Sequence, residues 1–308
     1  VVGAGVAGLH AAWRLSREHD VTLYEANDYA GGHTATVDVE WEGRTYGVDT
    51  GFIVFNDWTY PNFIAMLEEL GVAWQSSNMS FSLRCERRGL EYNGTSVNSL
   101  FAQRRNALRP SFLRMIADIL RFNARSREVV GSLDGTLTLG EYLARGNYSR
   151  QFVEHYIVPM GRAIWSAEAS AMLDFPARFF VDFFDRHGFL SVDERPVWQA
   201  VKGGSREYVR ALLRAAQFDL RLATPVESIL RLPNEVRVRT ARGDVARYDH
   251  VFLACHAPQA LAMLEAPTAA EREVLDSFPY AANEVLLHTD ASVLPRRTLA
   301  RAAWNYHL

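Results

Sequence analysis

Apolar and polar positions follow different periods along the chain, and the changes between them divide it into parts. Near the start, two valines precede a glycine-rich turn, and apolar side chains then recur every three or four positions at Leu9, Ala12, Trp13 and Leu15. That spacing predicts a helix with one apolar stripe. The run DVTLYEA, residues 20–26, predicts a strand after the helix. The chain therefore begins as strand, turn, helix and strand.

The middle of the chain, from about Trp74 to Pro196, has a helical period and lacks glycine-rich turns. Thr138 and Glu141 have the spacing of a capping box and predict the start of one of these helices. Five phenylalanines fall within residues 175–184. We expect these rings to fill a core or to line an apolar pocket.

After Pro196 the pattern of the first residues returns. A glycine pair, Gly203-Gly204, precedes a predicted helix, and alternating apolar residues between 224 and 248 predict a β-hairpin. The apolar run HVFLACHAP, residues 250–258, predicts a buried strand. Strands that alternate with helices on both sides of a helical middle predict an α/β fold with discontinuous domains.

Composition limits what the chain can do. It has 308 residues with a net charge of −3, which gives no reason to expect nucleic acid as a partner. Two cysteines outside any CxxC spacing indicate a reducing compartment, and we expect a cytoplasmic protein. Nine histidines without ligand spacing predict no metal site. No apolar run reaches the ~18 residues of a membrane span.

The glycine-rich turn has the spacing of a dinucleotide site. Gly3, Gly5 and Gly8 form G-x-G-x-x-G between the first strand and the first helix. The first glycine permits the turn, the second lets a pyrophosphate approach, and the third lets the helix pack on the strand. Glu25 ends the second strand, where it would meet a ribose diol and repel a 2′-phosphate. These residues disfavour NADP, leave NAD and FAD open, and do not exclude a glycine turn without a ligand.

A second glycine pair, Gly31-Gly32, follows the acid, and a plain nicotinamide fold has no need of it. The segment YEANDYAGGHT, residues 24–34, resembles the motif of the flavin amine oxidase and phytoene desaturase superfamily, which reads acid, then Gly-Gly-Arg-x-x-Thr. His33 stands where arginine is usual, and Thr36 matches the later hydroxyl. The resemblance implies that the chain passes close to the FAD pyrophosphate here. The alternative is an ordinary loop.

Further segments extend the resemblance to this superfamily. YGVDTGFIVFN, residues 46–56, is similar to the segment that runs beside the flavin ring, although a buried strand with a bulge at Gly51 would read the same way. Pro225-Val226 resembles the stretch that holds the adenine. The resemblance implies FAD as the cofactor, no metal, and cofactor contacts from Gly3, Ala4, Gly5, Val6, Ala7, Gly8, Glu25, Ala26, Gly31, Gly32, His33, Thr34, Gly51, Phe52, Ile53, Val226 and Ala254.

The resemblance also implies an architecture: a Rossmann-like FAD domain of the glutathione reductase type, with a discontinuous α+β substrate domain. We expect the FAD domain in 1–73 and 196–267, and the substrate domain in 74–195 and 268–308. VDTGFIVFN and PMGRAIWSA are most similar to a bacterial group of NAD/FAD-binding, amine oxidase-like proteins that accompany cyclopropane fatty acid synthases. The family's last FAD motif is absent and the first strand is short, so we expect that segments are missing at both ends. Their contribution to FAD binding is open at this stage.

The expected chemistry is hydride transfer from a substrate to flavin N5, for which no catalytic residue is assigned. Lys202 is the only lysine, and we expect it to be solvated at a helix start rather than near N5. Cys255 and His256 point to opposite faces of a strand, so they cannot act as a pair. Asn56 follows the flavin segment and could reach a substrate.

The substrate is open at this stage. We favour an unsaturated or methylated acyl lipid; the alternatives are a generic amine, a flavin-binding protein without turnover, or an NAD-dependent dehydrogenase. A predicted helix from Ser111 would carry Phe112, Met115, Ile116, Ile119 and Phe122 on one side, and Arg114, Arg121 and Arg125 with Asp118 on the other. It predicts either a solvated helix face or peripheral contact with the inner face of a membrane. Nothing in the sequence indicates the oligomeric state or the electron acceptor.

Overall fold

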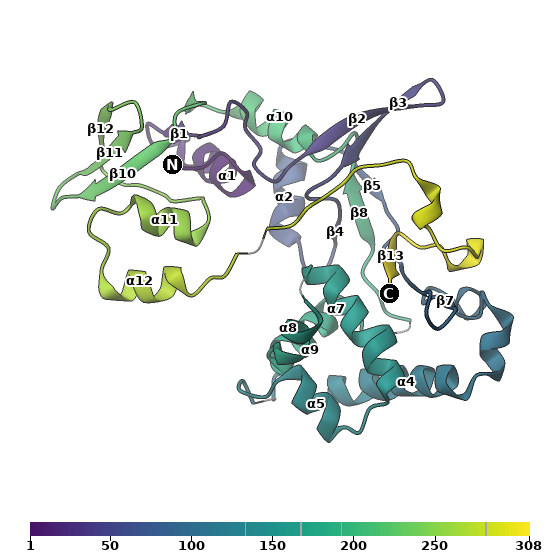
Figure 1. Ribbon diagram of the computed structural model, residues 1–308. Helices are drawn as coiled ribbons and strands as arrows, with labels where there is room; N and C mark the ends of the chain where they lie inside the picture. The colour runs from purple at the N-terminus through teal and green to yellow at the C-terminus, as the bar shows by residue number, and fades with distance from the viewer. Residues whose placement is uncertain (133, 167, 192, 281) are drawn as a thin grey trace. The chain divides into compact units, whose positions relative to one another are not determined.

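The computed structural model describes residues 1–132, 134–166, 168–191, 193–280 and 282–308. They form two compact units (Figure 1). Unit 1 comprises Val1–Val54, Asn62–Gln75 and Ala200–Leu286, and unit 2 comprises Phe55–Pro61, Ser76–Gln199 and Leu287–Leu308. Each unit therefore combines segments that are distant in sequence.

Unit 1 contains a parallel sheet with helices, as the sequence predicts for an α/β fold. Strand β1 (Thr22–Tyr24) pairs in parallel with β9 (Asp219–Arg221). Val2 forms parallel bridges to Tyr24 on one side and to Leu253 on the other, so the first strand lies inside the sheet. The predicted α/β class is confirmed, and the glycine-rich turn follows the carboxyl end of this inner strand, where such sheets bind ligands.

The other elements of unit 1 surround this sheet. An antiparallel sheet of β10 (Val226–Arg231), β11 (Val236–Thr240) and β12 (Val245–Tyr248) buries Ile229 and Val238 against Val2 and Tyr24. The remaining elements are α1 (Val6–Leu15), β2 (Thr36–Trp41), β3 (Arg44–Asp49), α2 (Pro61–Glu69), α10 (Arg206–Ala215), α11 (Ala257–Met263) and α12 (Ala269–Asp276). The predicted hairpin in 224–248 is thus present.

Helix α12 begins as the sequence predicts. Thr268 Oγ1 accepts the N–H of Glu271, and a Glu271 carboxylate oxygen accepts the N–H of Thr268 at 2.7 Å. The helix lies in unit 1, whereas we expected residues from 268 onward in the substrate domain. Arg231 of β10 contacts this helix through two hydrogen bonds to the Glu271 carboxylate, so α12 lies beside that sheet.

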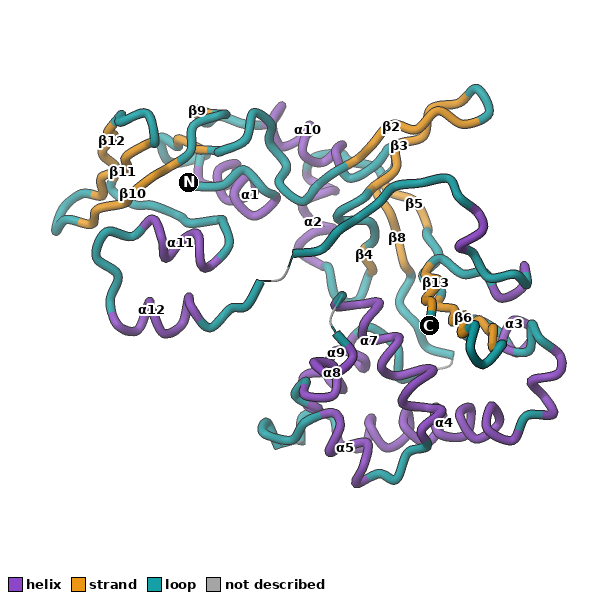
Figure 2. The backbone as a smooth tube through the Cα atoms, viewed as in Figure 1, coloured by secondary structure: helices purple, strands orange, loops and turns teal. Residues whose placement is uncertain are grey.

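Unit 2 is mainly helical, as Figure 2 shows by colour. Its helices are α3 (Val97–Leu100), α4 (Pro110–Val129), α5 (Leu139–Arg145), α6 (Arg150–Phe152), α7 (Val158–Trp165), α8 (Ala169–Asp174) and α9 (Ala177–Arg186), with a π-helical turn at Val153–Ile157 and 3₁₀ turns at Arg104–Leu108, Ala291–Val293 and Thr298–Ala300. The predicted capping box of α5 is confirmed, since Thr138 and Glu141 exchange hydrogen bonds of 3.2 Å. Among the described residues, no helix combines the length and apolar character needed to cross a bilayer.

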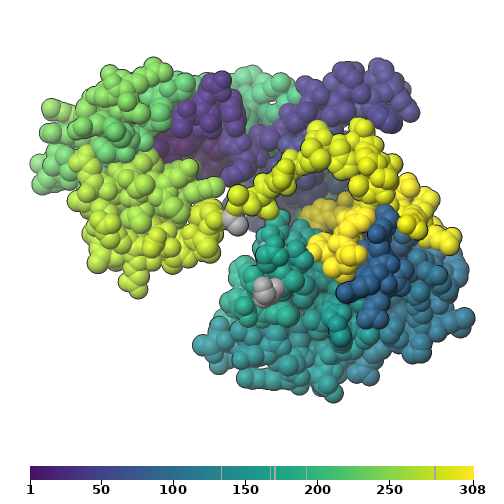
Figure 3. Space-filling model, viewed as in Figure 1, coloured from purple at the N-terminus to yellow at the C-terminus, as the bar shows by residue number. Residues whose placement is uncertain are grey.

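Unit 2 also contains strands that the helical period did not predict. Strand β6 (Phe81–Cys85) pairs with β7 (Leu90–Asn93) and, in parallel, with β13 (Trp304–His307). In Figure 3 the yellow C-terminal segment accordingly lies against the blue segment that carries β6 and β7. Every residue of β6 and β7 is buried, so neither strand shows the alternation of a half-buried strand. Short strands β4 (Phe55–Asn56), β5 (Trp74–Ser76) and β8 (Trp198–Val201) lie near the points where the chain passes between the units.

The phenylalanine-rich segment of α9 contributes to the core of unit 2. Phe180 and Phe184 are buried, and their ring centroids lie 4.1 Å apart in a stacked arrangement. Trp165 packs against the rings of both. Of the two predicted roles for this segment, the structure supports core packing.

Helix α4 differs from its prediction at one residue. Phe112, Met115 and Phe122 are buried as expected, but Asp118 is also buried, with 1% of its surface exposed. Asp118 accepts hydrogen bonds from Arg121 at 2.8 Å and from the N–H of Ser149 at 2.9 Å. Burial alone would raise the pKa of Asp118, but the hydrogen bonds from Ser149 and the charges of Arg121 and Arg114 bring it below its usual value. The placement of Asp118 on the outer side of the helix was wrong, because this buried carboxylate joins α4 to the residues that begin α6.

Candidate functional site

The glycine-rich turn leaves one position open and closes two. A Cβ atom on Gly3 would lie 2.6 Å from the carbonyl oxygen of Ala254, and one on Gly8 would lie 1.8 Å from the carbonyl oxygen of Gly3. A Cβ on Gly5 would meet nothing within 4 Å. Gly3 and Gly8 are therefore required by packing, whereas Gly5 leaves free space above the turn, as a bound pyrophosphate would need.

The start of α1 faces this open space. Its N-cap residue is Gly5, which has no side chain to cap the helix, and Val6 and Ala7 are exposed. The first backbone N–H groups of a helix lack intrahelical partners and carry the positive end of its dipole. The turn therefore presents donors and positive potential to an anion.

Glu25 is connected to the turn directly. It is 8% exposed, and its Oε2 accepts the N–H of Ala4 at 2.7 Å. Its Oε1 accepts the N–H and the side-chain amide of Asn27 at 2.9 and 3.0 Å. A carboxylate oxygen can accept more than one hydrogen bond, so this arrangement leaves lone pairs for a ribose hydroxyl.

We expect Glu25→Ala to lower the free energy of unfolding by about 2 kcal/mol even without added flavin, because the buried N–H of Ala4 would lose its acceptor. Glu25→Gln should cost less, since an amide oxygen can still accept that bond. Urea unfolding followed by circular dichroism measures both, with the exposed Glu18→Ala as the control. An unchanged midpoint for Glu25→Ala would limit Glu25 to a role in ligand binding.

The second glycine pair lies beside the first turn. The N–H of Gly31 donates to the carbonyl of Ala4 at 2.8 Å, and Gly31 forms a parallel bridge with Gly5. A Cβ on Gly32 would lie 3.0 Å from Cα of Gly5. The φ angles of Gly31 and Gly32, +129° and +58°, favour glycine as well. The pair and the first turn, separate in sequence, therefore form one glycine-lined surface.

His33 and Thr34 continue from this surface. The His33 ring stacks on His256 with centroids 5.5 Å apart, and His256 stacks on Tyr280 at 4.3 Å. The hydroxyl of Thr34 is hydrogen-bonded to that of Tyr208. Sequence reasoning dismissed His256 because it cannot pair with Cys255, and it did not predict the contact with His33. The only signal was its position in the apolar run 250–258. The prediction of a buried strand there was wrong, because this run forms a single bridge, Leu253 to Val2, and Phe252 is 49% exposed.

The segment around Gly51 packs against the loop of the second glycine pair. A Cβ on Gly51 would lie 1.9 Å from the carbonyl oxygen of His33, so this glycine is required by the chain's own backbone. Phe52 contacts the rings of Phe63 and Tyr208 with centroids 5.2 and 6.5 Å apart. Ile53 is 49% exposed. The predicted passage of this segment beneath a flavin stays a prediction.

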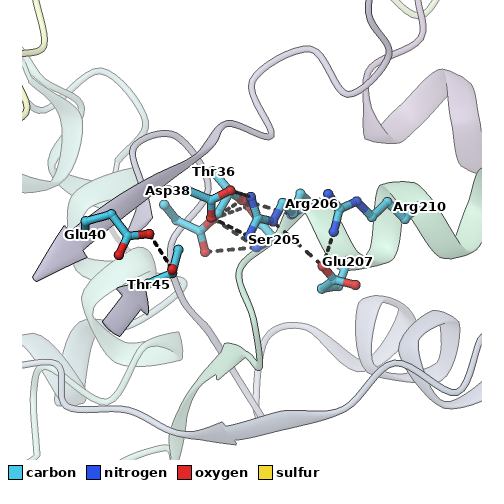
Figure 4. A network of polar contacts seen from close by, with 9 residues as sticks. Thr36, Asp38, Glu40, Thr45, Ser205, Arg206, Glu207 and Arg210 are labelled. Carbon is cyan, nitrogen blue, oxygen red and sulfur yellow. Dashed lines mark hydrogen bonds and ion pairs between the residues drawn. The ribbon is translucent and has the colours of Figure 1, made fainter. Parts of the chain in front are cut away.

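A polar cluster joins this segment to the start of α10, and sequence reasoning missed it. The Asp49 carboxylate accepts the Ser205 N–H at 2.9 and 3.0 Å, the Ser205 hydroxyl at 2.7 Å and the Thr36 hydroxyl at 2.5 Å. Arg206 extends the cluster through two bonds to Asp38, at 2.7 and 2.6 Å (Figure 4). The Arg206 hydrogen bonds lower the pKa of Asp38 below its usual value. We call Thr36, Asp49 and Ser205 the Asp49 cluster.

The remaining predicted cofactor residues also lie in unit 1. Val226 begins β10 and packs with Val2 and Tyr24, and the N–H of Thr224, two residues earlier, donates to the Glu25 carbonyl at 2.8 Å. The N–H of Ala254 donates to Val2 at 2.8 Å, next to the turn. Ala26 is exposed beside Glu25. The predicted positions thus lie in one unit. Direct contacts join four of the predicted segments: Gly3–Gly8, Glu25, Gly31–His33 and Ala254.

Three residues that the sequence offered as candidates for catalysis or substrate contact lie outside the glycine-lined surface. Lys202 is exposed, as expected. Cys255 is a free thiol whose pKa is raised by burial, which disfavours the nucleophilic thiolate. Asn56 belongs to unit 2 and is fully buried, and its Oδ1 accepts the N–H groups of Trp58 and Thr59 at 2.9 Å. Asn56 therefore holds a turn. Among the described residues no cluster of histidine, cysteine and carboxylate side chains suits a metal ion.

Comparisons with known proteins agree with this geometry. The family model described as flavin containing amine oxidoreductase matches residues 6–299. A search of curated proteins gave no match.

Similar solved structures include cyclohexylamine oxidase from Brevibacterium oxydans IH-35A, with a TM-score of 0.66 and 17% identity. A CLA-producing fatty acid isomerase from P. acnes has a TM-score of 0.63 and 17% identity. Wild-type putrescine oxidase bound to putrescine has a TM-score of 0.64 and 17% identity. Each likeness covers 89% of this chain and 62% of the other, so the chain spans less than two thirds of those proteins. At this identity the likeness shows the fold, which is the predicted one.

Proposed function

Because the chain belongs to the flavin containing amine oxidoreductase family, whose members bind FAD, we propose that it binds FAD and acts as an FAD-dependent oxidoreductase. The observation that carries the proposal is the contact between the two glycine segments, in which Gly31 donates to Ala4 and bridges to Gly5. An NAD-dependent dehydrogenase needs the first turn and Glu25 only. The second segment is explained by a cofactor whose pyrophosphate is covered from both sides.

Different residues of unit 1 would bind different parts of FAD. The first N–H groups of α1 and the open space above Gly5 would receive the pyrophosphate, with His33 as a further donor where the family usually has arginine. The Glu25 carboxylate would accept hydrogen bonds from the ribose hydroxyls. The flavin, when bound, supplies the hydride acceptor, and the protein supplies position and electrostatics. No side chain of this chain is assigned as a catalytic base.

The full-length protein should be yellow when purified. When FAD is added to the apoprotein, binding should saturate and should change the flavin fluorescence. NAD under the same conditions should leave the protein's fluorescence and melting temperature unchanged. A bound ligand stabilises the folded state, so FAD should also raise the melting temperature. A colourless protein that is stabilised by NAD and not by FAD would overturn the proposal.

For the substrate, we propose an unsaturated or methylated acyl chain. Unit 2 has a cavity of about 650 Å³ whose lining is mostly apolar, with Val153, Val158, Pro159 and Leu173, and also includes Arg87, Glu154 and Arg162. That volume and lining suit an acyl chain better than a small polar amine. The similarity to the bacterial group that accompanies cyclopropane fatty acid synthases favours the same class. The alternative is an amine, since two of the similar structures are amine oxidases by name.

Lipid extracts from cells with and without the intact gene distinguish these substrates, together with peroxide release from a panel of amines. The acyl proposal predicts a changed lipid profile and no peroxide. An unchanged profile with rapid peroxide release from a primary amine would replace it with the amine. Anaerobic mixing adds a third outcome: flavin that no candidate bleaches would favour a flavin-binding protein without turnover.

A further inference from the structure

We propose that the outward face of α4 is a docking surface for an anionic lipid bilayer. The surface consists of Leu108, in the turn before the helix, and of Leu113, Ala117, Leu120 and Ala124, with arginines on both sides. We call it the α4 surface. The proposal concerns unit 2 alone and does not depend on the proposed flavin chemistry.

The α4 surface is apolar where a helix of a water-soluble protein is normally polar. Its four members within the helix, Leu113, Ala117, Leu120 and Ala124, recur at intervals of four, three and four residues and so share one side of α4, and Leu108 lies in the turn before the helix. Leu108, Leu113 and Leu120 are 86%, 44% and 54% exposed, and both alanines are exposed. The opposite side of α4 already packs into the core through Phe112, Met115 and Phe122. The exposed leucines are thus a second apolar stripe that the packing of unit 2 does not use.

The charges around the stripe select the partner. On a helical projection Arg114 and Arg125 lie on one side of the stripe and Arg127 on the other, and all three are exposed. Asp118 does not face solvent, and it is paired with Arg114 and Arg121. Glu128, near the end of the helix, is an exposed acid, but the exposed arginines outnumber it. The exposed side of α4 therefore has a net positive charge, although the whole chain has a net charge of −3. An apolar stripe between cations matches a bilayer with anionic headgroups.

A cavity at the start of α4 lies beside Leu108, on the side of the helix that carries Phe112 and Met115. It has a volume of about 310 Å³, and its lining includes Leu108, Arg88 and Arg109. Two guanidinium groups beside an exposed leucine place cationic donors where a lipid headgroup would lie if Leu108 entered the acyl region. A second copy of this chain would present the same cations and would be repelled, which favours lipid over self-association.

The experiment is co-sedimentation of the protein with vesicles of phosphatidylcholine, alone or mixed with phosphatidylglycerol, at low and high salt. We expect binding to the mixed vesicles, little binding to phosphatidylcholine alone, and a decrease as salt screens the charges. The double variant Leu113→Gln, Leu120→Gln should lower the partition coefficient by about tenfold or more. Arg125→Gln with Arg127→Gln should lower it by roughly tenfold at low salt.

Matched control variants distinguish binding through the α4 surface from non-specific binding to vesicles. Leu299→Gln removes an exposed leucine of unit 2 elsewhere, and Arg186→Gln removes an exposed arginine of α9; neither should change vesicle binding. Thermal melting should be unchanged in every variant, because these side chains are exposed. Absence of binding to the mixed vesicles, or binding that the leucine and arginine variants leave intact, would overturn the proposal. So would a protein dimer that the leucine variant dissociates, since a second copy would then cover the surface.

Discussion

Replacing Gly5 with valine should give a folded protein that no longer retains flavin. A Cβ on Gly5 meets nothing within 4 Å, and the residue's φ and ψ of −70° and 178° suit any side chain. We therefore expect the melting temperature of the apoprotein to stay near that of the wild type. The new methyl groups would occupy the space for the pyrophosphate, so the affinity for FAD should fall by at least about a hundredfold. Fluorescence titration with FAD measures the loss.

Gly8→Ala is the control for Gly5→Val, because it should disrupt folding rather than cofactor binding. Its Cβ would lie 1.8 Å from the carbonyl oxygen of Gly3, and backbone there cannot move without disturbing the inner strand of the sheet. We expect this smaller substitution to prevent folding of unit 1, seen as loss of a cooperative melt. If Gly5→Val instead melts as early as Gly8→Ala, the open space above Gly5 is not a ligand site and the turn has a structural role only.

Asp49→Ala should cause the second large effect, a loss of about 3 kcal/mol in the free energy of unfolding. The substitution removes the acceptor of the Ser205 N–H and hydroxyl and of the Thr36 hydroxyl, and Ser205 is 1% exposed. Hydrogen bonds to a charged acceptor contribute about 1.5–3 kcal/mol each, and buried donors left without a partner add a penalty. Urea unfolding of the apoprotein measures the change.

Asp38→Ala is the control for Asp49→Ala. Asp38 also bonds to the start of α10, through Arg206, but that pair is exposed, and exposed ion pairs contribute little. Asp38→Ala should therefore shift the unfolding midpoint only slightly, and Asp49→Asn should fall between the two alanine variants. Equal losses for Asp38→Ala and Asp49→Ala would mean that the buried bonds of Ser205 are not what stabilises this region.

Local sequence rules predicted the features that depend on a few neighbouring residues. The turn at Gly3–Gly8 and the capping boxes at Thr138 and Thr268 are encoded within a few positions, and the structure has each of them. Strands β6 and β7 were missed because a strand buried on both faces has no period that separates it from a buried helix.

Contacts between distant segments could not be predicted from spacing. Asp49 and Ser205 are 156 residues apart, and neither carries a motif that names the other as its partner. The same holds for the stacking of His33 on His256. The burial of Asp118 was mispredicted because helical periodicity gives the side of a helix on which a residue lies, not what packs against that side. Here the segment that packs against it contains Ser149, whose N–H donates to the Asp118 carboxylate. The second glycine pair was recognised through a resemblance, and only the structure places it against Ala4.

The position of the first strand also has a consequence for synthesis on the ribosome. Val2 is paired with Tyr24 on one side and with Leu253 on the other, so one neighbour is translated at once and the other about 250 residues later. At about 5–20 residues per second, the nascent chain carries an incomplete sheet for roughly 12 to 50 s. During that interval the open edge beside Val2 can pair with other unfinished chains. Slower elongation should therefore increase aggregation of this protein and its dependence on chaperones that shield exposed strands.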